Sequence, residues 1–475
     1  MAGSVKSLLL MFLERGRQGM RNILPFAMAA LIVLCDPAHG ETPPAFSGMS
    51  YLDNGTVRLG INLDIGGAIT YLSQSGTDEN IINSHDWGRQ IQMSFYGGPT
   101  PYFPDNGKKP RDSWTFLGWN PIQSGDTFNN PSEVIAHSNN GKELYVKCIP
   151  MHWPLDDEPA QCTFECWFTL ENNTVRVRSQ LNNAREDHTN YAARGQELPA
   201  VYTNGTYYRL FTYDSDQPFT NGPVRQIEKV WDTSIPPAEA PGGPWDSWYA
   251  TENWAALVRE DDFGIGIWTP NTFAYKGGFA GTPGAGGPKD APTGYISPTR
   301  QEILDHNIQY RYDYTLIVGQ LAKIREYVYE HADRTTLPDY QFEHDRQSWT
   351  LAEAEGQGWP IEGTWVVTFT SEQPRLIGPE AFWKAEKMPT VYLRAAFDTG
   401  SKSAVLRWEG LGGSGGGQIR FDVIPDGAVR TYAIDLSAAE AYRGLCTRLT
   451  LLPETDGEDG RGVTIHGLGF TKPPA

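Results

Sequence analysis

The chain has 475 residues, 39% of them hydrophobic and 20% charged, with a formal net charge of −18 and a pI near 5.0. Such a negative chain repels the phosphate backbone of nucleic acids, so a nucleic-acid partner is excluded. The 50 glycines, 34 prolines and 12% aromatic residues are typical of many short strands joined by turns. They indicate an all-β protein.

The first residues are typical of a signal peptide. Arg15, Arg17 and Arg21 precede an apolar run at 23–34. That run is shorter than the roughly 20 apolar residues of a spanning helix. We therefore expect a signal peptide at residues 1–40 and a secreted or periplasmic protein that does not span the membrane, with an uncleaved membrane anchor as the alternative. The remaining length suits two domains.

Four cysteines follow the predicted signal: Cys148, Cys162, Cys166 and Cys446. Export permits disulfides, and Cys148 and Cys162 lie on consecutive predicted strands, which favours a bridge between them. Cys162 and Cys166 are an even number of positions apart and share one strand face. Zinc sites need a second close pair of ligands, so we expect no metal, and no motif indicates a cofactor.

The first part of the chain predicts antiparallel strands and one helix. Alternating apolar and polar residues mark half-buried strands, at Thr56–Ile61, Arg89–Tyr96, Thr163–Leu170 and Thr174–Leu181. Trp254–Val258 and Gly264–Trp268 are predicted to form a hairpin across residues 259–262. The residues 171–173 form a hairpin-turn signal. Ile324, Tyr327 and Val328 have helical spacing and predict a helix over Leu321–His331. A domain boundary is expected after it, at residues 335–336.

The second part, residues 336–475, predicts a smaller β-sandwich of jelly-roll type. Its alternating runs are at Trp365–Phe369, Thr390–Ala396, Ala404–Trp408, Gln418–Val423, Thr431–Leu436 and Val463–Leu468. The glycine-rich segment at 410–417 is expected to be a mobile loop. It is no phosphate-binding loop, because no Lys-Ser/Thr pair follows it.

Two segments carry a resemblance to a known family. Gly66–Leu72 and Asn80–Arg89 resemble the opening of galactose-mutarotase-like proteins. The resemblance implies a large antiparallel β-supersandwich at residues 41–335 and a sugar contact for Arg89. The chain lacks the His-Pro-aromatic-Asn-Leu segment with the family's acid histidine, so simple aldose epimerisation is not expected. The second part resembles galactose-binding-like jelly rolls of secreted carbohydrate-active enzymes, including its ending Ile465–Phe470.

A sugar site needs flat apolar platforms for ring C–H faces and polar side chains for the hydroxyls. Trp119, Trp245 and Trp248 are the candidate platforms, with a place in the core as the alternative for each. Trp245 and Trp248 lie in the loop-like segment at 241–249, where exposed aromatic residues indicate contact with a ligand.

Polar candidates begin at Arg89. With Gln90 and Gln92 it forms a row that can hold hydroxyls or a carboxylate; alternatively Arg89 pairs with Asp86 and orders the turn. Asp126, close to Trp119 in sequence, is a further candidate ligand, or else a turn residue.

The polar segment at 182–202 follows a strong strand and holds the first-choice catalytic residue, Glu197. Its position before Leu198–Pro199 suggests partial desolvation, which suits general-acid catalysis. Tyr191, Arg194 and Gln196 are the expected substrate ligands beside it. The alternative for Glu197 is an ion pair with Arg194 or Arg185.

Glu252, between aromatic residues, is the second candidate carboxylate. Two carboxyl groups roughly 5 to 10 Å apart on either side of a glycosidic bond permit hydrolysis, so we expect a glycoside hydrolase acting on a poly- or oligosaccharide. A first alternative is a lyase, in which His85 or Tyr191 removes a proton beside a uronate carboxylate that Arg89 neutralises. A second is a non-catalytic glycan-binding protein of the envelope.

Overall fold

The alternating runs of the sequence form antiparallel strands in the computed structural model, which describes residues 46–237, 239–334, 337–413, 416–455 and 461–473. Along β9 (Cys162–Glu171) every second side chain from Cys162 to Phe168 is buried. The predicted turn at 171–173 joins β9 to β10 (Thr174–Asn183), with Glu171 opposite Thr174. The protein is all-β, as the sequence predicts.

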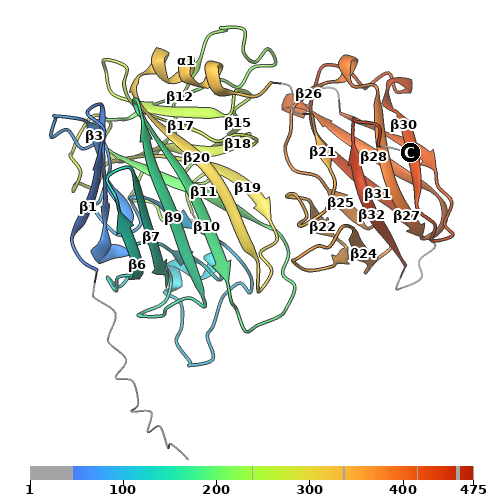
Figure 1. The fold of residues 1–475 in the computed structure, drawn as a ribbon, viewed down its shortest axis with the longest axis horizontal. Helices are drawn as coiled ribbons and strands as arrows, with labels where there is room; N and C mark the ends of the chain where they lie inside the picture. Colours follow the sequence, from blue (N-terminus) through green and yellow to red (C-terminus); the bar gives the residue numbers. More distant parts are fainter. Residues whose placement is uncertain (1–45, 238, 335–336, 414–415, 456–460, 474–475) are drawn as a thin grey trace, which may run out of the picture. The chain divides into compact units, whose positions relative to one another are not determined.

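Two large sheets make up the first part of the fold (Figure 1). The 11-stranded sheet contains β1 (Met49–Asp53), β2 (Val57–Asn62), β3 (Ala68–Gln74), β4 (Ile91–Ser94), β5 (Pro121–Ile122), β8 (Met151–His152), β11 (Arg194–Asn204), β14 (Val230–Trp231), β15 (Asp246–Tyr249), β18 (Ala274–Ala280) and β19 (Thr293–Glu302). The nine-stranded sheet contains β6 (Glu133–Asn139), β7 (Glu143–Ile149), β9, β10, β12 (Arg209–Thr212), β13 (Arg225–Ile227), β16 (Trp254–Val258), β17 (Phe263–Trp268) and β20 (Gln309–Gln320).

The core of this first sandwich lies between the two sheets. Phe95, directly after β4, packs edge to face on Phe164 of β9 with ring centroids 5.5 Å apart. Val177 of β10 and Ile296 of β19 belong to the same buried cluster. Side chains on the opposite face of the 11-stranded sheet lie outside this core, and several of them line a cavity.

Two six-stranded sheets form a second β-sandwich. One contains β21 (Asp339–Tyr340), β23 (Ala354–Gly356), β24 (Trp365–Phe369), β27 (Thr390–Asp398), β30 (Arg430–Asp435) and β32 (Gly462–Gly469). The other contains β22 (Thr350–Ala352), β25 (Arg375–Ile377), β26 (Trp383–Lys384), β28 (Gly400–Gly410), β29 (Gly417–Asp422) and β31 (Leu445–Thr455). Trp365 and Leu393 from the first sheet share a core with Trp408 and Leu449 from the second.

Helix α1 spans Leu321–His331, the bounds that the sequence predicts. Its apolar side chains Ile324 and Val328 are buried against Trp254 and Ala256 of β16, because residues four apart lie on one face of a helix. Short 3-10 helices are η1 (Leu63–Ile65), η2 (Asp112–Leu117), η3 (Ala385–Lys387), η4 (Leu411–Gly413) and η5 (Leu436–Ala438). No helix in the described part of the chain has the length and apolar character to cross a membrane.

Three sequence predictions fall outside the described residues. They are the signal peptide at 1–40, the domain boundary at 335–336 and the middle of the glycine-rich loop at 414–415. The two sandwiches have separate hydrophobic cores, while residue contacts group Ala45–Ala475 as one compact unit. The division into two domains therefore stays a prediction.

The predicted disulfide is wrong. Cys148, Cys162, Cys166 and Cys446 are all buried and free. In the pairing of β7 with β9, Cys148 lies opposite Phe164, while Cys162 lies opposite Asn183 of β10. This offset of the two cysteines along the strands prevents a bridge. Cys162 and Cys166 are buried on one face of β9, as their spacing predicts.

Gly66 and Gly67 turn the chain from η1 into β3, with φ of 63° and 71°. L-residues rarely adopt this left-handed conformation. A Cβ atom on Gly66 would lie 1.8 Å from the carbonyl oxygen of Gln123, whereas Gly76, at φ 78°, has no atom within 4 Å of such a Cβ. The glycines of the sequence motif thus allow a close approach of two backbone segments.

We expect Gly66→Ala to lower the free energy of unfolding by roughly 3 kcal/mol or more, because overpacking adds to left-handed strain. Gly76→Ala is the matched control and should cost about 1–2 kcal/mol from strain alone. Denaturant unfolding measures both. Equal losses in the two variants would contradict the close-approach explanation.

Candidate functional site

A β-bulge in β11 sets the geometry of the site. In the 11-stranded sheet β11 lies between β4 and β19, and its register shifts between Glu197 and Ala200 against β4 and between Glu197 and Val201 against β19. Leu198 and Val201 face the core, while Glu197, Ala200 and Tyr202 line a cavity. Because regular alternation would place Glu197 and Tyr202 on opposite faces, the extra residue of the bulge brings them together.

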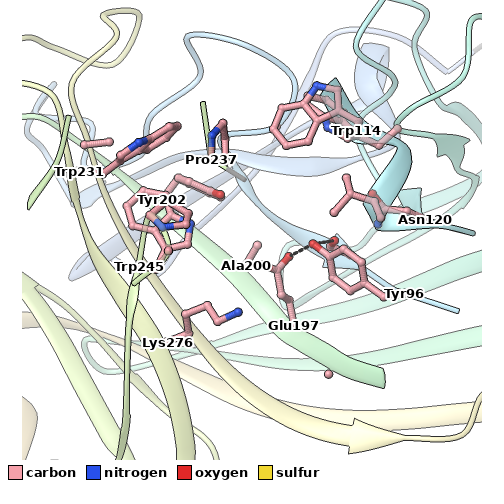
Figure 2. A pocket seen from close by; sticks show the side chains of 18 of the residues that line it. Tyr96, Trp114, Asn120, Glu197, Ala200, Tyr202, Trp231, Pro237, Trp245 and Lys276 are labelled. Carbon is pink, nitrogen blue, oxygen red and sulfur yellow. Dashed lines mark hydrogen bonds between the residues drawn. The ribbon is translucent and has the colours of Figure 1, made fainter. Parts of the chain in front are cut away.

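The cavity has a volume of about 900 Å³. Strands of the 11-stranded sheet supply its floor, including Ser94 of β4, Glu197 and Thr299 of β19. Figure 2 shows Trp114 on one side of this hollow and Trp231 with Trp245 on the other. The cavity therefore combines a polar floor with aromatic walls.

The aromatic walls are built from packed ring pairs. Trp114 contacts Trp153 edge to face with centroids 6.1 Å apart, and Trp231 contacts Trp245 in the same way at 5.6 Å. The buried ring of Tyr295 packs 4.7 Å from Trp245. Each tryptophan remains partly exposed at the cavity. Such rings offer apolar surfaces that can face the C–H side of a sugar ring.

Two tyrosine hydroxyls hold the Glu197 carboxylate. The Tyr96 hydroxyl donates to Oε2 at 2.9 Å, and the Tyr295 hydroxyl donates to Oε1 (Figure 2 draws the Tyr96 bond). Burial raises the pKa of Tyr96 and of Tyr295 well above the ordinary value, and the charge of Glu197 raises both further. Both phenols therefore remain protonated and donate to the two oxygens of the Glu197 side chain. The expected ion pair of Glu197 with Arg194 or Arg185 does not occur.

The arginines of the cavity bind protein oxygens. Arg89 forms an ion pair with Asp86, Nε to Oδ2, at 3.0 Å and donates to the carbonyl of Ala291, so the turn-ordering alternative describes it. Arg194 donates to the carbonyls of Gly97 at 3.2 Å and Leu117 at 2.7 Å. Both side chains line the cavity and hold its wall together.

Lys276 is the remaining cation of the cavity lining. It is exposed and lies on β18, two strands from β11 in the order β11-β19-β18. Figure 2 shows its amino group directed into the hollow on the side of Glu197. Within the described ranges no residue forms a hydrogen bond or an ion pair with its side chain.

Part of the predicted site is assembled here. Arg89, Gln92, Arg194, Glu197 and Trp245 line the one cavity, although they are spread over more than 150 positions of sequence. Across the residues that the structure describes, no three His, Cys, Asp or Glu side chains are grouped to hold a metal ion.

Four predicted ligands are buried instead. Trp119 and Trp248 are 1% and 8% exposed and belong to the core. The half-buried strand predicted at 89–96 is shorter, because β4 begins at Ile91 and ends at Ser94, and all four of its side chains are buried. Gln90 precedes β4, and its side-chain amide donates to the Asp86 carbonyl at 2.6 Å. Gln196 is 0% exposed, and its amide group bonds the backbone N–H and carbonyl of Tyr96, each at 2.8 Å. These four predictions are corrected, because the residues are buried and cannot contact a ligand in the cavity.

Three other candidates lie outside the cavity. Asp126 accepts backbone N–H bonds from Phe128 at 2.7 Å and Asn130 at 3.0 Å, the arrangement of a turn residue. The Tyr191 hydroxyl donates to Asp187 at 2.6 Å. His85 is exposed, with Nδ1 2.9 Å from the Lys289 carbonyl. None of the three lines the hollow, so the predicted contact with substrate is corrected for each.

Glu252 is also corrected. Its side chain is fully buried and pairs with Arg325, Oε1 to Nη2, at 2.9 Å. The Tyr329 hydroxyl donates to it at 2.7 Å and Trp254 Nε1 at 3.0 Å. Since Arg325 and Tyr329 belong to α1, this cluster fastens the helix to β16. The predicted carboxylate pair of Glu197 with Glu252 is therefore wrong.

The sequence reasoning missed Tyr96, Tyr202, Tyr295, Trp231 and Lys276. Tyr202 ends the polar segment at 182–202, but the face of the sheet on which its side chain lies depends on the bulge in β11. Pro199 is the available signal, because proline inside a central strand is found at bulges.

Searches for related proteins gave structural matches only. No protein-family model matches the chain, and none of the curated proteins matches it. A galactose mutarotase related enzyme from Lactobacillus acidophilus is 12% identical with a TM-score of 0.33, over 57% of this chain and 97% of that one. A galactose mutarotase-like protein from Lactobacillus casei is 12% identical with a TM-score of 0.34, over 57% and 100%.

Both Lactobacillus proteins belong to the galactose-mutarotase-like proteins, the group that the sequence resembles. An α-galactosidase from Geobacillus stearothermophilus also matches, at 8% identity and a TM-score of 0.33, over 57% of this chain and 40% of that one. With these TM-scores, neither the fold nor the site described above rests on the matches.

We expect Glu252→Gln to lower the free energy of unfolding at neutral pH by about 3–5 kcal/mol, because it leaves Arg325 without its buried partner. Burial by itself would raise the pKa of Glu252, but the donors from Arg325, Trp254 and Tyr329 outweigh it and hold the pKa below the ordinary value. The carboxylate thus stabilises the fold above the unfolded-state pKa of about 4.3. That stability is lost as the pH falls through the lower folded-state pKa.

Unfolding in denaturant at several pH values between about 6 and 3 measures this effect. The wild type should lose more stability over this interval than Glu252→Gln. Glu330→Gln, an exposed change on the same helix, serves as the control and should follow the wild type. Parallel curves for the wild type and Glu252→Gln would contradict the assignment.

Proposed function

We propose that this protein cleaves glycosidic bonds of a saccharide bound in the cavity, with Glu197 as the proton-transferring group. The observation that carries the proposal is the Glu197 carboxylate, held by Tyr96 and Tyr295 on the floor of a tryptophan-walled cavity. Carboxylates in such positions act in general acid–base catalysis.

The size and lining of the cavity support saccharide binding. A volume of about 900 Å³ lies within the range of small-molecule sites and accommodates a short oligosaccharide. Trp114 and Trp245 offer flat apolar surfaces on opposite sides, while Glu197, Thr299 and Gln301, which are at least partly exposed, supply hydrogen-bonding groups. Walls and floor together provide the two kinds of contact that a sugar ring requires.

Hydrolysis requires two carboxyl groups. Beside Glu197, the carboxylate in the described cavity lining is Asp86, so hydrolysis would engage Asp86 in addition to its ion pair with Arg89. β-Elimination is the second candidate reaction. The engagement of Asp86 favours it, since elimination needs one base and one proton donor, and Glu197 with the adjacent Tyr96 hydroxyl supplies both.

The proposal includes the signal peptide predicted at residues 1–40, which would direct this activity to the periplasm or the medium. The second sandwich then serves as an accessory domain of the enzyme. In this arrangement the first sandwich carries the reaction, because the cavity lies on its 11-stranded sheet.

We expect Glu197→Gln to abolish cleavage, a loss of about 100-fold or more, because the amide cannot transfer the proton. The purified chain is incubated with a panel of polysaccharides while reducing ends and ultraviolet absorbance are recorded together. Reducing ends alone indicate hydrolysis, and added absorbance indicates the double bond left by elimination. Glu330→Gln, exposed on α1, should keep full activity. Full activity of Glu197→Gln, or binding without any product from the wild type, refutes the proposal.

A second test concerns the aromatic wall. Phe116 is 44% exposed and lines the cavity, whereas Phe103 is 55% exposed and lies outside its lining. We expect Phe116→Ala to weaken binding of a responsive oligosaccharide by roughly tenfold, the value of one aromatic contact, and Phe103→Ala to leave it unchanged. Isothermal titration with Glu197→Gln as the inactive background measures both. Equal affinities would place the sugar elsewhere.

A further inference from the structure

Four of the five charged side chains in the described cavity lining form hydrogen bonds or ion pairs with other parts of the protein, and one does not. The charged residues of the lining are Asp86, Arg89, Arg194, Glu197 and Lys276. Asp86 and Arg89 form an ion pair at 3.0 Å. Arg194 donates to carbonyls of the wall, and Glu197 accepts from two tyrosines.

Lys276 differs from all of these. Its side chain has no hydrogen bond or ion pair to any described residue, and its ammonium group is directed into the hollow (Figure 2). It lies on β18, across β19 from the strand that carries Glu197. A cation in this place faces the same bound molecule as the proton-transferring carboxylate.

We infer that the substrate is an anionic saccharide, with a carboxylate or sulfate group that pairs with Lys276. This inference rests on the proposed function and names its substrate class. An ammonium group binds such oxygens through charge-assisted hydrogen bonds. Lys276 is the charged side chain of the described cavity lining that has no partner within the protein and can pair with a ligand.

The net charge of the chain and the net charge of the cavity lining have opposite signs, as a local binding site for an anion requires. The chain as a whole carries −18, so its long-range field opposes an anionic substrate. Inside the cavity the cations Arg89, Arg194 and Lys276 outnumber the anions Asp86 and Glu197. At physiological salt the Debye length is about 8 Å, so a ligand within the cavity responds mainly to these nearby charges.

The inference also bears on the reaction. In a uronate, a cation at the carboxylate stabilises the negative charge that develops when the neighbouring C–H proton is removed. Glu197 would take that proton, the new C=C bond would form, and the C–O bond to the leaving sugar would break, with Tyr96 donating the proton to the departing oxygen. Lys276 thus has the place of the charge-neutralising residue that the sequence reasoning assigned to Arg89.

The test compares three oligosaccharides of equal length. The first carries uronate carboxylates, the second is uncharged, and the third has the uncharged sugar backbone with sulfate groups added. Affinities for Glu197→Gln are measured by isothermal titration, with and without the additional change Lys276→Met. We expect an anionic oligosaccharide to bind best and Lys276→Met to weaken it by roughly tenfold or more, the value of a hydrogen bond to a charged group. Lys142→Met, an exposed change in the β6–β7 turn, is the control and should have no effect.

The outcomes are distinguishable. Tighter binding of the uronate or of the sulfated chain, lost in Lys276→Met, supports the inference and identifies the acidic group. Neutral binding as tight as anionic binding, unchanged in Lys276→Met, overturns it while leaving saccharide cleavage in place. Failure of all three, together with no product from any polysaccharide, defeats the proposed function itself.

Discussion

The bulge in β11 is the constraint on which the site depends. A regular strand would direct Glu197 and Tyr202 to opposite faces, and the cavity would lose either its carboxylate or part of its wall. With the extra residue, Leu198 and Val201 still fill the core while Glu197 reaches the hydroxyls of Tyr96 and Tyr295. These two hydrogen bonds tie the end of β4 and β19 to the strand between them. The bulge in β11 thus keeps the core filled and at the same time places the Glu197 carboxylate in the cavity.

The protein handles charge in two distinct ways. Glu252 with Arg325, and Asp305 with Arg346, are buried pairs in which each carboxylate is fully bonded. Removing charges from water is costly unless they are paired, so such groups serve the structure. Glu197 is only partly buried and accepts one tyrosine hydrogen bond at each oxygen, whereas Glu252 accepts five hydrogen bonds. Completeness of hydrogen bonding therefore separates structural carboxylates from the candidate reactive one more clearly than sequence context does.

The sequence predicted the elements better than the site. Strands such as β9 and β24 and helix α1 were placed correctly because period-2 and helical spacing follow directly from burial on one face. The site failed where side-chain direction depended on pairing. Trp119 and Trp248 sit in a loop-like or polar context in the sequence, yet the sheets bury them. Glu252 and Glu197 share an aromatic neighbourhood, but only the sheet order reveals that one faces α1 and the other the cavity. The Cys148–Cys162 bridge failed because strand register is not visible in one sequence.

The unbridged cysteines have a further consequence. Burial raises the pKa of the Cys166 and Cys446 thiols to about 12 and that of Cys148 well above its usual value, and thiol–disulfide exchange proceeds through the thiolate. These sulfur atoms therefore behave as apolar packing atoms that neither oxidants nor reductants reach. The described strands are therefore held together by packing and hydrogen bonding, and their four cysteines contribute to that packing without a covalent cross-link.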